Sequence, residues 1–324
     1  MKLQGLSETG MGCAGTFAGA RPIALVNTTR AGIIYAVAAY GLWGVFPVYF
    51  KAVRTVPAFE VLAHRIVWSA AVLFLLLVLR REMGSVFAAI RDRRTVLTLA
   101  VTTCLITFNW VTFIWAVANN YLLQVSLGYF INPLISVLLG TLFLRERLRA
   151  WQWASVLLAA GGVAYLAVGL GEFPGIGLLL ACSFALYGLL RKTARVDALA
   201  GLMIETALLT PLATAFLAWE MWHGRAVFLA GSVRMDALLM AAGVVTATPL
   251  LWFAQAARRL RLSTLGLLQY LAPTGHFLLA VFAYGEPFTR THLLAFGAIW
   301  TALLIYSLDA TVGRRAPAPA SLPE

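Results

Sequence analysis

Charged residues are scarce in this chain. They make up 12% of its 324 residues, whereas apolar residues make up 61%, against roughly a quarter and a half in soluble domains. A soluble fold of this length would have too few charged side chains to cover its surface. The shortage of charge therefore excludes a soluble protein and predicts an all-α polytopic membrane protein.

Cysteine, metal-ligand and nucleotide-binding patterns are also missing. Cys13, Cys104 and Cys182 form no closely spaced pair, which excludes a disulfide framework and a zinc site. The sequence has no Gly-x-x-x-x-Gly-Lys-Ser/Thr loop and no His-Glu-x-x-His motif, so we expect no cofactor, no metal and no ATP hydrolysis through such a loop. The net charge of +12 is distributed between apolar runs, so no nucleic acid is expected as a partner.

Long apolar runs fill most of the chain. A helix needs about 20 mostly apolar residues to cross a bilayer. The sequence predicts ten transmembrane helices, at residues 31–50, 58–79, 96–118, 121–144, 151–170, 176–190, 199–219, 235–257, 262–284 and 292–309. Because these runs are continuously apolar rather than alternating, they exclude a β-barrel.

The positions of lysine and arginine indicate how the spans are oriented. If the N-terminus is cytoplasmic, few basic residues fall in the predicted outer segments, namely Lys51, Arg54, Arg225, Arg234 and Arg290. Almost all the others fall in inner segments, as the positive-inside rule requires. We therefore expect ten spans with cytoplasmic N and C termini. A missed or extra span would invert the later loops and remove this bias.

A weak internal repeat divides the spans into two sets. One shift of the sequence aligns Pro133 with Pro273 and Glu146 with Glu286. Each set holds five helices, and because five is odd the second set must enter the membrane from the opposite side. Inverted repeats of this kind are a common transporter architecture, with the solute site near the midplane between them.

The repeat also defines the predicted domains. The two five-helix units cover residues 31–170 and 176–310. Residues 1–30 and 311–324 contain no apolar run of span length and are predicted to be disordered tails. A start codon assigned too early is the alternative explanation for the first tail.

Several motifs carry a family resemblance. They are Tyr40-Gly-Leu-Trp-Gly44, Glu60-Val-Leu-Ala-His-Arg65, Ser126-Leu-Gly-Tyr-Phe-Ile-Asn-Pro133, Gly201-Leu-Met-Ile-Glu-Thr206 and Arg259-Leu-Arg-Leu-Ser-Thr-Leu-Gly266. In these stretches the chain resembles the drug/metabolite transporter superfamily, in its ten-helix EamA branch, and within it the RarD group, often labelled chloramphenicol-sensitive protein. The resemblance covers the chain except its tails. The chain departs from the pattern at Gly275 and His276 and in its long N-terminal segment.

The resemblance implies a permease of the bacterial cytoplasmic (inner) membrane that exports small metabolites or drugs. The expected partners are a small-molecule solute and the lipid bilayer. A homodimer is one oligomeric state that the sequence allows. Transport would proceed by alternating access, in which the two halves open a central site to one side at a time. Proton antiport and uniport driven by the solute gradient are the two energetic alternatives. An intramembrane enzyme and a sensor are the other functional classes considered.

Three ionisable residues lie together near the outer end of the second span. Glu60 and His64 are four apart and share a helix face, whereas Arg65 points to a different side. One hypothesis is that Glu60 and Arg65 flank the solute cavity and that Glu60 or His64 exchanges a proton, because histidine titrates near physiological pH. The alternative is a structural cluster whose side chains reach water at the membrane surface.

Glu205 is the most conspicuous charge within a span. It lies inside the seventh predicted span with no basic residue within four positions. A carboxyl group there must be neutral, paired across helices or exposed to water. The repeat matches Glu205 to Glu60 after a few residues of slippage, so the two carboxyl groups are expected to approach the cavity from opposite sides. The alternative is a protonated acid bonded to a neighbouring helix.

Polar and aromatic side chains inside other spans complete the predicted solute and proton pathway. Together they predict an aromatic-lined cavity for an apolar or amphipathic solute, although polar residues in spans also serve as contacts between helices. Besides Glu60, His64, Arg65 and Glu205, the residues predicted to line this pathway are Asn109, Trp110, Tyr129, Asn132, Gln255, Gln269, Tyr270 and His276.

The repeat-matched prolines and glutamates receive structural predictions. Proline removes a helix hydrogen bond, so Pro133 and Pro273 are expected to kink their helices and to bend during alternating access, with a fixed kink as the alternative. Glu146 and Glu286 follow apolar spans in short loops. We expect these two carboxylates to bond neighbouring groups rather than the solute.

Overall fold

The structure is a computed structural model that describes residues 22–119, 121–170, 173–285 and 290–312. Within these ranges every regular element is a helix. The helices are α1 (Pro22–Gly44), α2 (Phe46–Ala52), α3 (Ala58–Leu79), α4 (Met83–Arg91), α5 (Arg93–Ala118), α6 (Leu122–Phe143), α7 (Ala150–Leu170), α8 (Gly175–Thr193), α9 (Ala198–Trp222), α10 (Val233–Arg259), α11 (Leu262–Leu268), α12 (Leu271–Leu278), the π-helix η1 (Leu279–Ala283) and α13 (Arg290–Val312).

Most of these helices are membrane spans by length and composition. Nine stretches of the described residues are long and apolar enough to cross a bilayer, and a further apolar helix at Leu293–Asp309 is shorter. Helix α3 coincides with the predicted second span at 58–79. The predicted all-α polytopic membrane fold is therefore confirmed.

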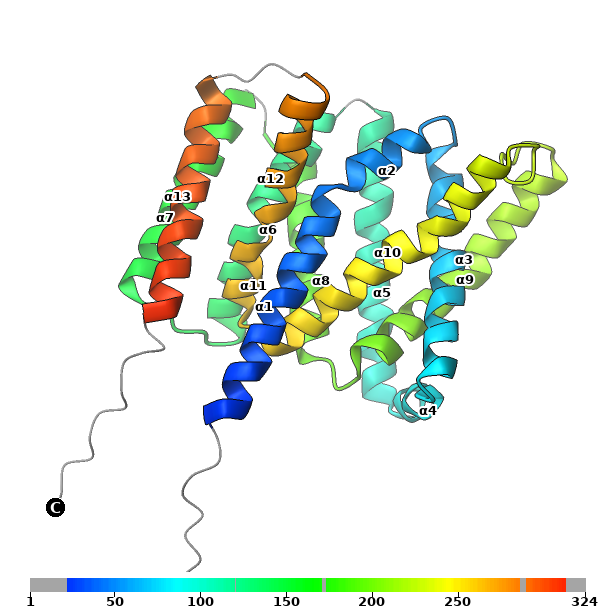
Figure 1. Cartoon of the computed structure of the whole chain (residues 1–324), viewed down its shortest axis with the longest axis horizontal. Coiled ribbons are helices and arrows are strands. Elements are labelled where there is room, and N and C mark those ends of the chain that lie inside the picture. The colour runs from blue at the N-terminus through cyan, green and yellow to red at the C-terminus, as the bar shows by residue number, and fades with distance from the viewer. Residues whose placement is uncertain (1–21, 120, 171–172, 286–289, 313–324) are drawn as a thin grey trace, which may run out of the picture.

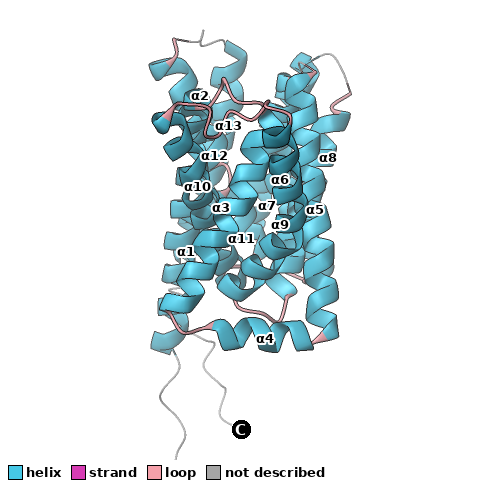
Figure 2. Cartoon of the chain, turned by 90° about the vertical axis from the view of Figure 1, so that its right-hand side faces the viewer, coloured by secondary structure: helices cyan, strands magenta, loops and turns pink. Residues whose placement is uncertain are grey.

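The long helices run side by side, and both described ends of the chain lie at the same end of the bundle (Figure 1). Figure 2 shows the short helix α4 lying crosswise at that end. We call it the α4 end and the other the opposite end. Helix α4 carries an exposed Phe87 and Ile90 and ends in Arg91, as expected of a helix that lies along a membrane surface.

Two of the spans are interrupted, and local hydrogen bonds bridge each gap. Between α1 and α2, the Val45 N–H donates to the Leu42 carbonyl at 3.2 Å. Between α11 and α12, the Ala272 N–H donates to the Gln269 carbonyl at 3.0 Å. Each bond closes a four-residue turn of the 3₁₀ type, which satisfies backbone groups that a membrane interior cannot hydrate.

The helices meet in pairs across the bundle. Helix α1 packs on α10, α3 on both α9 and α10, α6 on α8 and α11, and α7 on α13. Around the middle of the bundle, the fully buried rings of Tyr40, Tyr187 and Phe253 form a common cluster. The Tyr187 and Phe253 rings are stacked with their centroids 6.0 Å apart. These rings join α1, α8 and α10 into one core.

The structure differs from the sequence expectations at the span boundaries. Helix α1 begins at Pro22, so the described part of the segment 1–30 is helical, and proline suits the first turn of a helix. The residues 1–21 and 313–324 of the two predicted tails lie outside the described residues. Helix α8 continues to Thr193, beyond the predicted end at 190. Arg191, which we assigned to an inner loop, is therefore a buried helical residue.

Candidate solute site

A cavity of about 310 Å³ lies among the helices, a volume typical of small-molecule sites. It begins near the middle of the bundle and extends toward the opposite end. Helix α6, for example, lines it between Val125 and Asn132, in the half remote from the α4 end. Aromatic rings supply much of its wall, namely Tyr40, Trp43, Phe46, Phe50, Trp110, Phe113, Tyr129 and Phe184.

The structure brings many of the predicted residues to this cavity. Those that line it are Arg65, Asn109, Trp110, Tyr129, Asn132, Gln269, Pro273 and His276. Those that do not are Glu60, His64, Pro133, Glu205, Gln255 and Tyr270. The aromatic and amide lining expected from the sequence is therefore assembled, whereas the two repeat-matched carboxylates lie outside it.

Arg65 extends from α3 into the cavity. Its Nε donates to the Thr246 hydroxyl on α10 at 2.9 Å. Its guanidinium carbon lies 5.1 Å from the Trp110 ring centroid and 5.6 Å from that of Phe50, within the range of cation–π attraction. Three other helices, α2, α5 and α10, thus hold one cation at the wall of the cavity.

Glu60 and His64 face the connection between α9 and α10 instead of the cavity. Oε1 of Glu60 accepts the backbone N–H groups of Val227 at 2.8 Å and Phe228 at 3.2 Å. His64 Nδ1 accepts from Trp68 Nε1 at 3.2 Å, and the His64 ring lies 4.7 Å from the Phe228 ring between centroids. Glu60 does not flank the cavity with Arg65 because the backbone of this connection holds its carboxylate.

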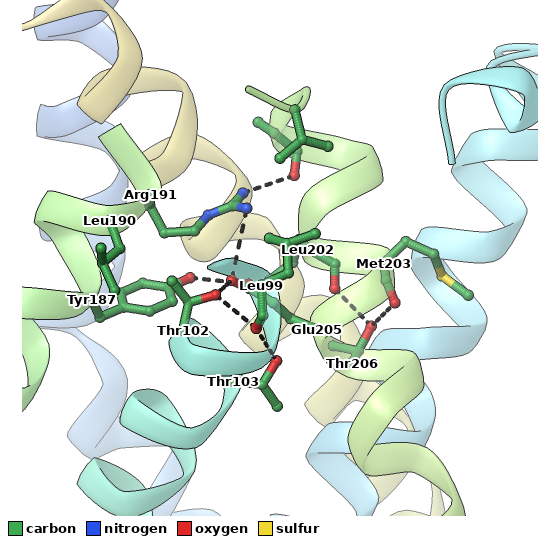
Figure 3. Close-up of polar contacts among 12 residues, drawn as sticks. Leu99, Thr102, Thr103, Tyr187, Leu190, Arg191, Leu202, Met203, Glu205 and Thr206 are labelled. Carbon is green, nitrogen blue, oxygen red and sulfur yellow. Dashed lines mark hydrogen bonds and ion pairs between the residues drawn. The ribbon is translucent and has the colours of Figure 1, made fainter. Parts of the chain in front are cut away.

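Glu205, in the first third of α9, is paired across helices (Figure 3). Its Oε1 lies 3.7 Å from Arg191 Nη1 on α8 and accepts from the Thr102 hydroxyl on α5 at 2.5 Å. The Tyr187 hydroxyl donates to Oε2 at 3.4 Å. All four side chains belong to one network that joins α5, α8 and α9. Of the outcomes open to Glu205, the structure favours pairing across helices.

Arg191 fits this network because a glycine faces it. Arg191 is 2% exposed, and its Nη2 donates to the Ala198 carbonyl at 3.2 Å. A Cβ added at Gly201 would lie 2.2 Å from Arg191 Nη1, so any side chain there would collide with the guanidinium. Gly201 leads one of the motifs quoted above, and its hydrogen side chain admits the buried ion pair.

The cavity amides are partly engaged with α8. Asn109 Nδ2 donates to the Leu180 carbonyl and to Ser183 Oγ, each at 2.9 Å. Asn132 Nδ2 donates to the Ala181 carbonyl at 3.2 Å. The Gln269 side chain makes no hydrogen bond to another described residue, so its amide is available to a solute. The first two amides fasten α5 and α6 to α8, while Gln269 is the amide best suited to binding.

His276 connects the two interrupted spans at the cavity wall. Its Nε2 lies 2.9 Å from the Trp43 carbonyl, close to the gap between α1 and α2. Pro47, four residues after Trp43, has no N–H to donate to that carbonyl. The backbones also approach closely here, since a Cβ added at Gly275 would lie 2.7 Å from Gly44 Cα. Gly275 and His276, which the sequence analysis distinguished from the family pattern, therefore lie at one helix contact.

The remaining predicted residues support helix packing. The Tyr270 hydroxyl donates to the Phe130 carbonyl at 3.1 Å, and Arg259 donates to the Gln255 side chain. Pro133 lies within the uninterrupted helix α6, whereas Pro273 follows directly on the gap between α11 and α12. Among these prolines, only Pro273 accompanies a break in its span.

Sequence reasoning missed several residues of these networks. Thr102, Tyr187 and Arg191 complete the Glu205 network, while Thr246 and Phe50 contact Arg65. Arg191 had a usable signal, because it directly follows the predicted sixth span, which was unusually short. Thr246 had none, since one threonine in an apolar helix predicts no particular partner.

An apolar helical bundle with an internal cavity of this size is typical of multi-pass membrane transporters. Residues 30–168 match the EamA-like transporter family. The chain belongs to this family and to its RarD group, as its similarity to RarD proteins over most of its length demonstrates. It is a multi-pass bacterial membrane protein.

Relatives with curated names support this membership. An "Uncharacterized transporter" of Vibrio cholerae is 47% identical over 86% of this chain and 93% of the relative. "Protein RarD" of Escherichia coli is 45% identical over 89% and 97%. "Chloramphenicol-sensitive protein RarD" of Pseudomonas aeruginosa is 32% identical over 86% and 94%. A solved crystal structure shares the fold, with a TM-score of 0.66 and 19% identity over 89% of this chain and all of that one.

Proposed function

We propose that this chain is a secondary-active exporter of small metabolites or drugs in the bacterial inner membrane. The observation that carries the proposal is the cavity of about 310 Å³ among the helices, whose lining on α6 lies in the half of that helix remote from the α4 end. A site that can be reached from one side at a time is what alternating access requires. The relatives named as transporters support the same class and favour it over an enzyme.

Ten spans in two inverted repeats are part of this proposal. The units are residues 31–170 and 176–310. The packing supports such a repeat, because helices of the first unit contact their counterparts in the second: α3 contacts α9, α6 contacts α11, and α7 contacts α13. In the same way α1 packs on α10 while α8 packs on α5. A two-fold axis in the membrane plane would generate these matched pairs.

The proposed orientation puts the α4 end in the cytoplasm. Arginine is concentrated around α4, at Arg80, Arg81, Arg91, Arg93 and Arg94. The positive-inside rule assigns such a cluster to the cytoplasmic side, which also makes both termini cytoplasmic. The cavity would then extend toward the outer surface, so this conformation would be the outward-facing one.

To load a solute from the cytoplasm, the α4 end must open. Contacts between α8 and α10 oppose this, since Lys192 Nζ donates to the Ala257 carbonyl at 3.2 Å and also to that of Leu260. The pair between Glu205 and Arg191 lies at the same end. We propose that these contacts separate when the chain turns inward and that the gap before Pro273 supplies the bend.

Proton antiport through Glu205 is the energetic part of the proposal. Separation of the α4 end would move Arg191 and leave the Glu205 carboxylate without its cation, which favours uptake of a proton. Glu60 is the less suitable carrier, because backbone N–H groups occupy its Oε1. A uniporter is the alternative, and it is favoured by the fact that neither carboxylate lines the cavity.

Reconstituted transport tests the function. Purified protein would be reconstituted into liposomes. The uptake and efflux of labelled amino acids, organic acids, other metabolites and chloramphenicol would then be measured with and without an imposed pH gradient. We expect saturable movement of at least one solute, accelerated by the pH gradient. Movement that ignores the gradient would support the uniporter. Absence of movement for every solute, with protein shown to be folded, would contradict the transporter.

A further inference from the structure

We propose that the cavity recognises an organic monocarboxylate, with Arg65 binding the carboxylate and the aromatic wall binding an apolar body. This inference rests on the transport function proposed above and specifies its substrate class. The main feature of the site is that its described lining carries an arginine but no carboxylate. Arg65 is the cation of the cavity wall, and none of the described residues that line the cavity is an aspartate or a glutamate.

Arg65 has binding capacity that the protein does not use. Its Nε is bonded to Thr246, but its Nη1 and Nη2 make no hydrogen bond to another described residue. Neither nitrogen is among the buried unpaired atoms of the described residues, so both are accessible from the cavity. A guanidinium presents its N–H groups as a fork that matches the two oxygens of a carboxylate.

The charge of Arg65 is also uncompensated. None of the ion pairs between described residues includes it, and the rings of Trp110 and Phe50 attract a cation without neutralising it. An arginine remains charged in proteins, and a charge within a span is costly. A bound anion would supply the missing counter-charge.

A second buried arginine of the same chain indicates what compensation looks like. Arg191 is more deeply buried than the half-buried Arg65, and it has a carboxylate partner in Glu205 at 3.7 Å and a carbonyl partner in Ala198. The fold therefore pairs the arginine that fastens helices together and leaves unpaired the arginine that faces the cavity. This contrast assigns Arg65 to a ligand rather than to the scaffold.

The rest of the wall defines the body of the solute. Besides Arg65, the cavity is lined by rings, including Trp43, Phe113 and Phe184, and by the neutral amide of Gln269. No aspartate or glutamate among the described lining residues could form an ion pair with a charged amine, and Arg65 would repel it. The Trp43 carbonyl, a further acceptor for an amine, is already bonded by His276. An aromatic carboxylate without a charged amine therefore fits better than an amino acid.

Binding of matched small molecules to the purified protein tests this inference. Phenylacetate and indole-3-acetate carry the expected head and body. Phenylacetamide has the same shape without charge, phenethylamine reverses the charge, and phenylalanine adds an ammonium group. Isothermal titration calorimetry on folded protein in nanodiscs would measure each affinity. We expect the two carboxylates to bind about tenfold or more tightly than phenylacetamide, as a charge-assisted hydrogen bond predicts.

Variants assign the effect to Arg65. Arg65→Gln should remove the preference for phenylacetate over phenylacetamide, and Arg65→Lys should retain part of it, because it keeps the charge and loses the fork. Arg54→Gln, which removes an exposed cation beyond α2 at the opposite end, should leave the preference unchanged and is the matched control. Monodisperse size-exclusion profiles and thermal unfolding would verify that each variant is folded.

The outcomes distinguish this inference from the transport function. Equal binding of phenylacetate and phenylacetamide by wild type, no binding of either carboxylate, or an unchanged preference in Arg65→Gln would overturn the carboxylate site. Liposome flux of neutral solutes together with any of these results would leave the transporter standing. Carboxylate binding that depends on Arg65, without flux of any solute, would retain the site and overturn the transporter.

Discussion

The imidazole of His276 lies with Nε2 2.9 Å from the carbonyl oxygen of Trp43. That carbonyl would receive the N–H of residue 47 in a continuous helix, but residue 47 is proline and has none. A side chain of α12 therefore supplies the hydrogen bond that α1 lacks where it breaks. Because the break and the histidine both line the cavity, this contact couples the shape of the site to the packing of two spans.

Replacing His276 should destabilise this contact. In His276→Ala the Trp43 carbonyl loses its partner in a partly buried position, which should cost about 1–3 kcal/mol. In a Pro47→Ala background the cost should be smaller, because alanine restores an N–H that can reach the same carbonyl. Thermal unfolding in detergent of the two single variants and the double variant would measure the coupling. Purely additive effects would contradict the proposed link.

A side chain at Gly201 should displace the Arg191 guanidinium. In Gly201→Ala the new Cβ would lie 2.2 Å from Arg191 Nη1, so the guanidinium must move away from Glu205. Disruption of a buried ion pair costs about 3–5 kcal/mol, and a large drop in unfolding temperature is expected. Gly161→Ala is the matched control, since a Cβ there meets nothing within 4 Å. Similar unfolding temperatures for the two variants would refute this role of Gly201.

Glu146 should stabilise the start of α11. Its Oε1 accepts the Leu262 N–H at 2.6 Å, and its Oε2 accepts the Ser263 N–H at 2.9 Å. The expectation that Glu146 bonds neighbouring groups is thus met, whereas its repeat partner Glu286 lies outside the described residues. Glu146→Gln keeps one acceptor oxygen and should lose about 0.5–2 kcal/mol, as for a helix cap. Chemical denaturation would measure the loss, with the exposed Glu82→Gln as the control.

The fold was largely predictable because the membrane imposes strong rules on sequence. Spans of about 20 apolar residues with all backbone groups bonded internally leave a clear pattern, and α3 began and ended where the sequence indicated. Helix α4 was not predicted, because nine residues with mixed polarity carry no transmembrane signal. The early start of α1 was missed for the same reason, since helix formation outside the membrane needs no apolar run.

The candidate site was only partly predictable because sequence identifies residue types and not their directions. Arg65, Trp110 and His276 were selected from their chemistry, and they do line the cavity. Glu60 and Glu205 were selected on equal grounds and do not, because their partners come from distant positions in the chain. A backbone N–H group such as that of Val227 leaves no sequence signal at all.

Asp92 should make stability depend on acid pH. It precedes α5, where its Oδ2 accepts the Thr95 hydroxyl at 2.6 Å and its Oδ1 accepts the Arg94 N–H at 3.2 Å. The hydrogen bond from the Thr95 hydroxyl has the largest effect, and it lowers the pKa of the Asp92 carboxyl from its ordinary value. The backbone N–H groups of Arg94 and Thr95 lower this pKa further. A lowered folded-state pKa means that the ionised form contributes stability above the ordinary value of about 3.9, and that this contribution is lost as the pH falls through the folded pKa.

Measuring the unfolding temperature as a function of pH would check the direction in which the contribution of Asp92 to stability changes. The advantage of wild type over Asp92→Ala should be constant from neutral pH to about 5 and should shrink below about 4. Asp236→Ala is unsuitable as a control, because Asp236 accepts the Leu229 N–H. Glu82→Gln, which removes an exposed carboxylate at the other end of α4, should leave the loss of stability at acid pH unchanged. An advantage that grows on acidification would contradict the assignment.

Glu205 should set the pH dependence of transport if the carrier exchanges protons. Glu205→Gln keeps the size of the side chain and an acceptor for the Thr102 hydroxyl, but it cannot take up a proton. We expect flux that no longer responds to a pH gradient while exchange of solute across the membrane persists. Glu60→Gln is the matched comparison, because its carboxylate is equally buried but bonded to backbone N–H groups. Its flux should keep the pH response of wild type. If both variants and the double variant retain that response, the proton role is excluded, and the uniporter explains why the cavity contains no carboxylate among its described lining residues.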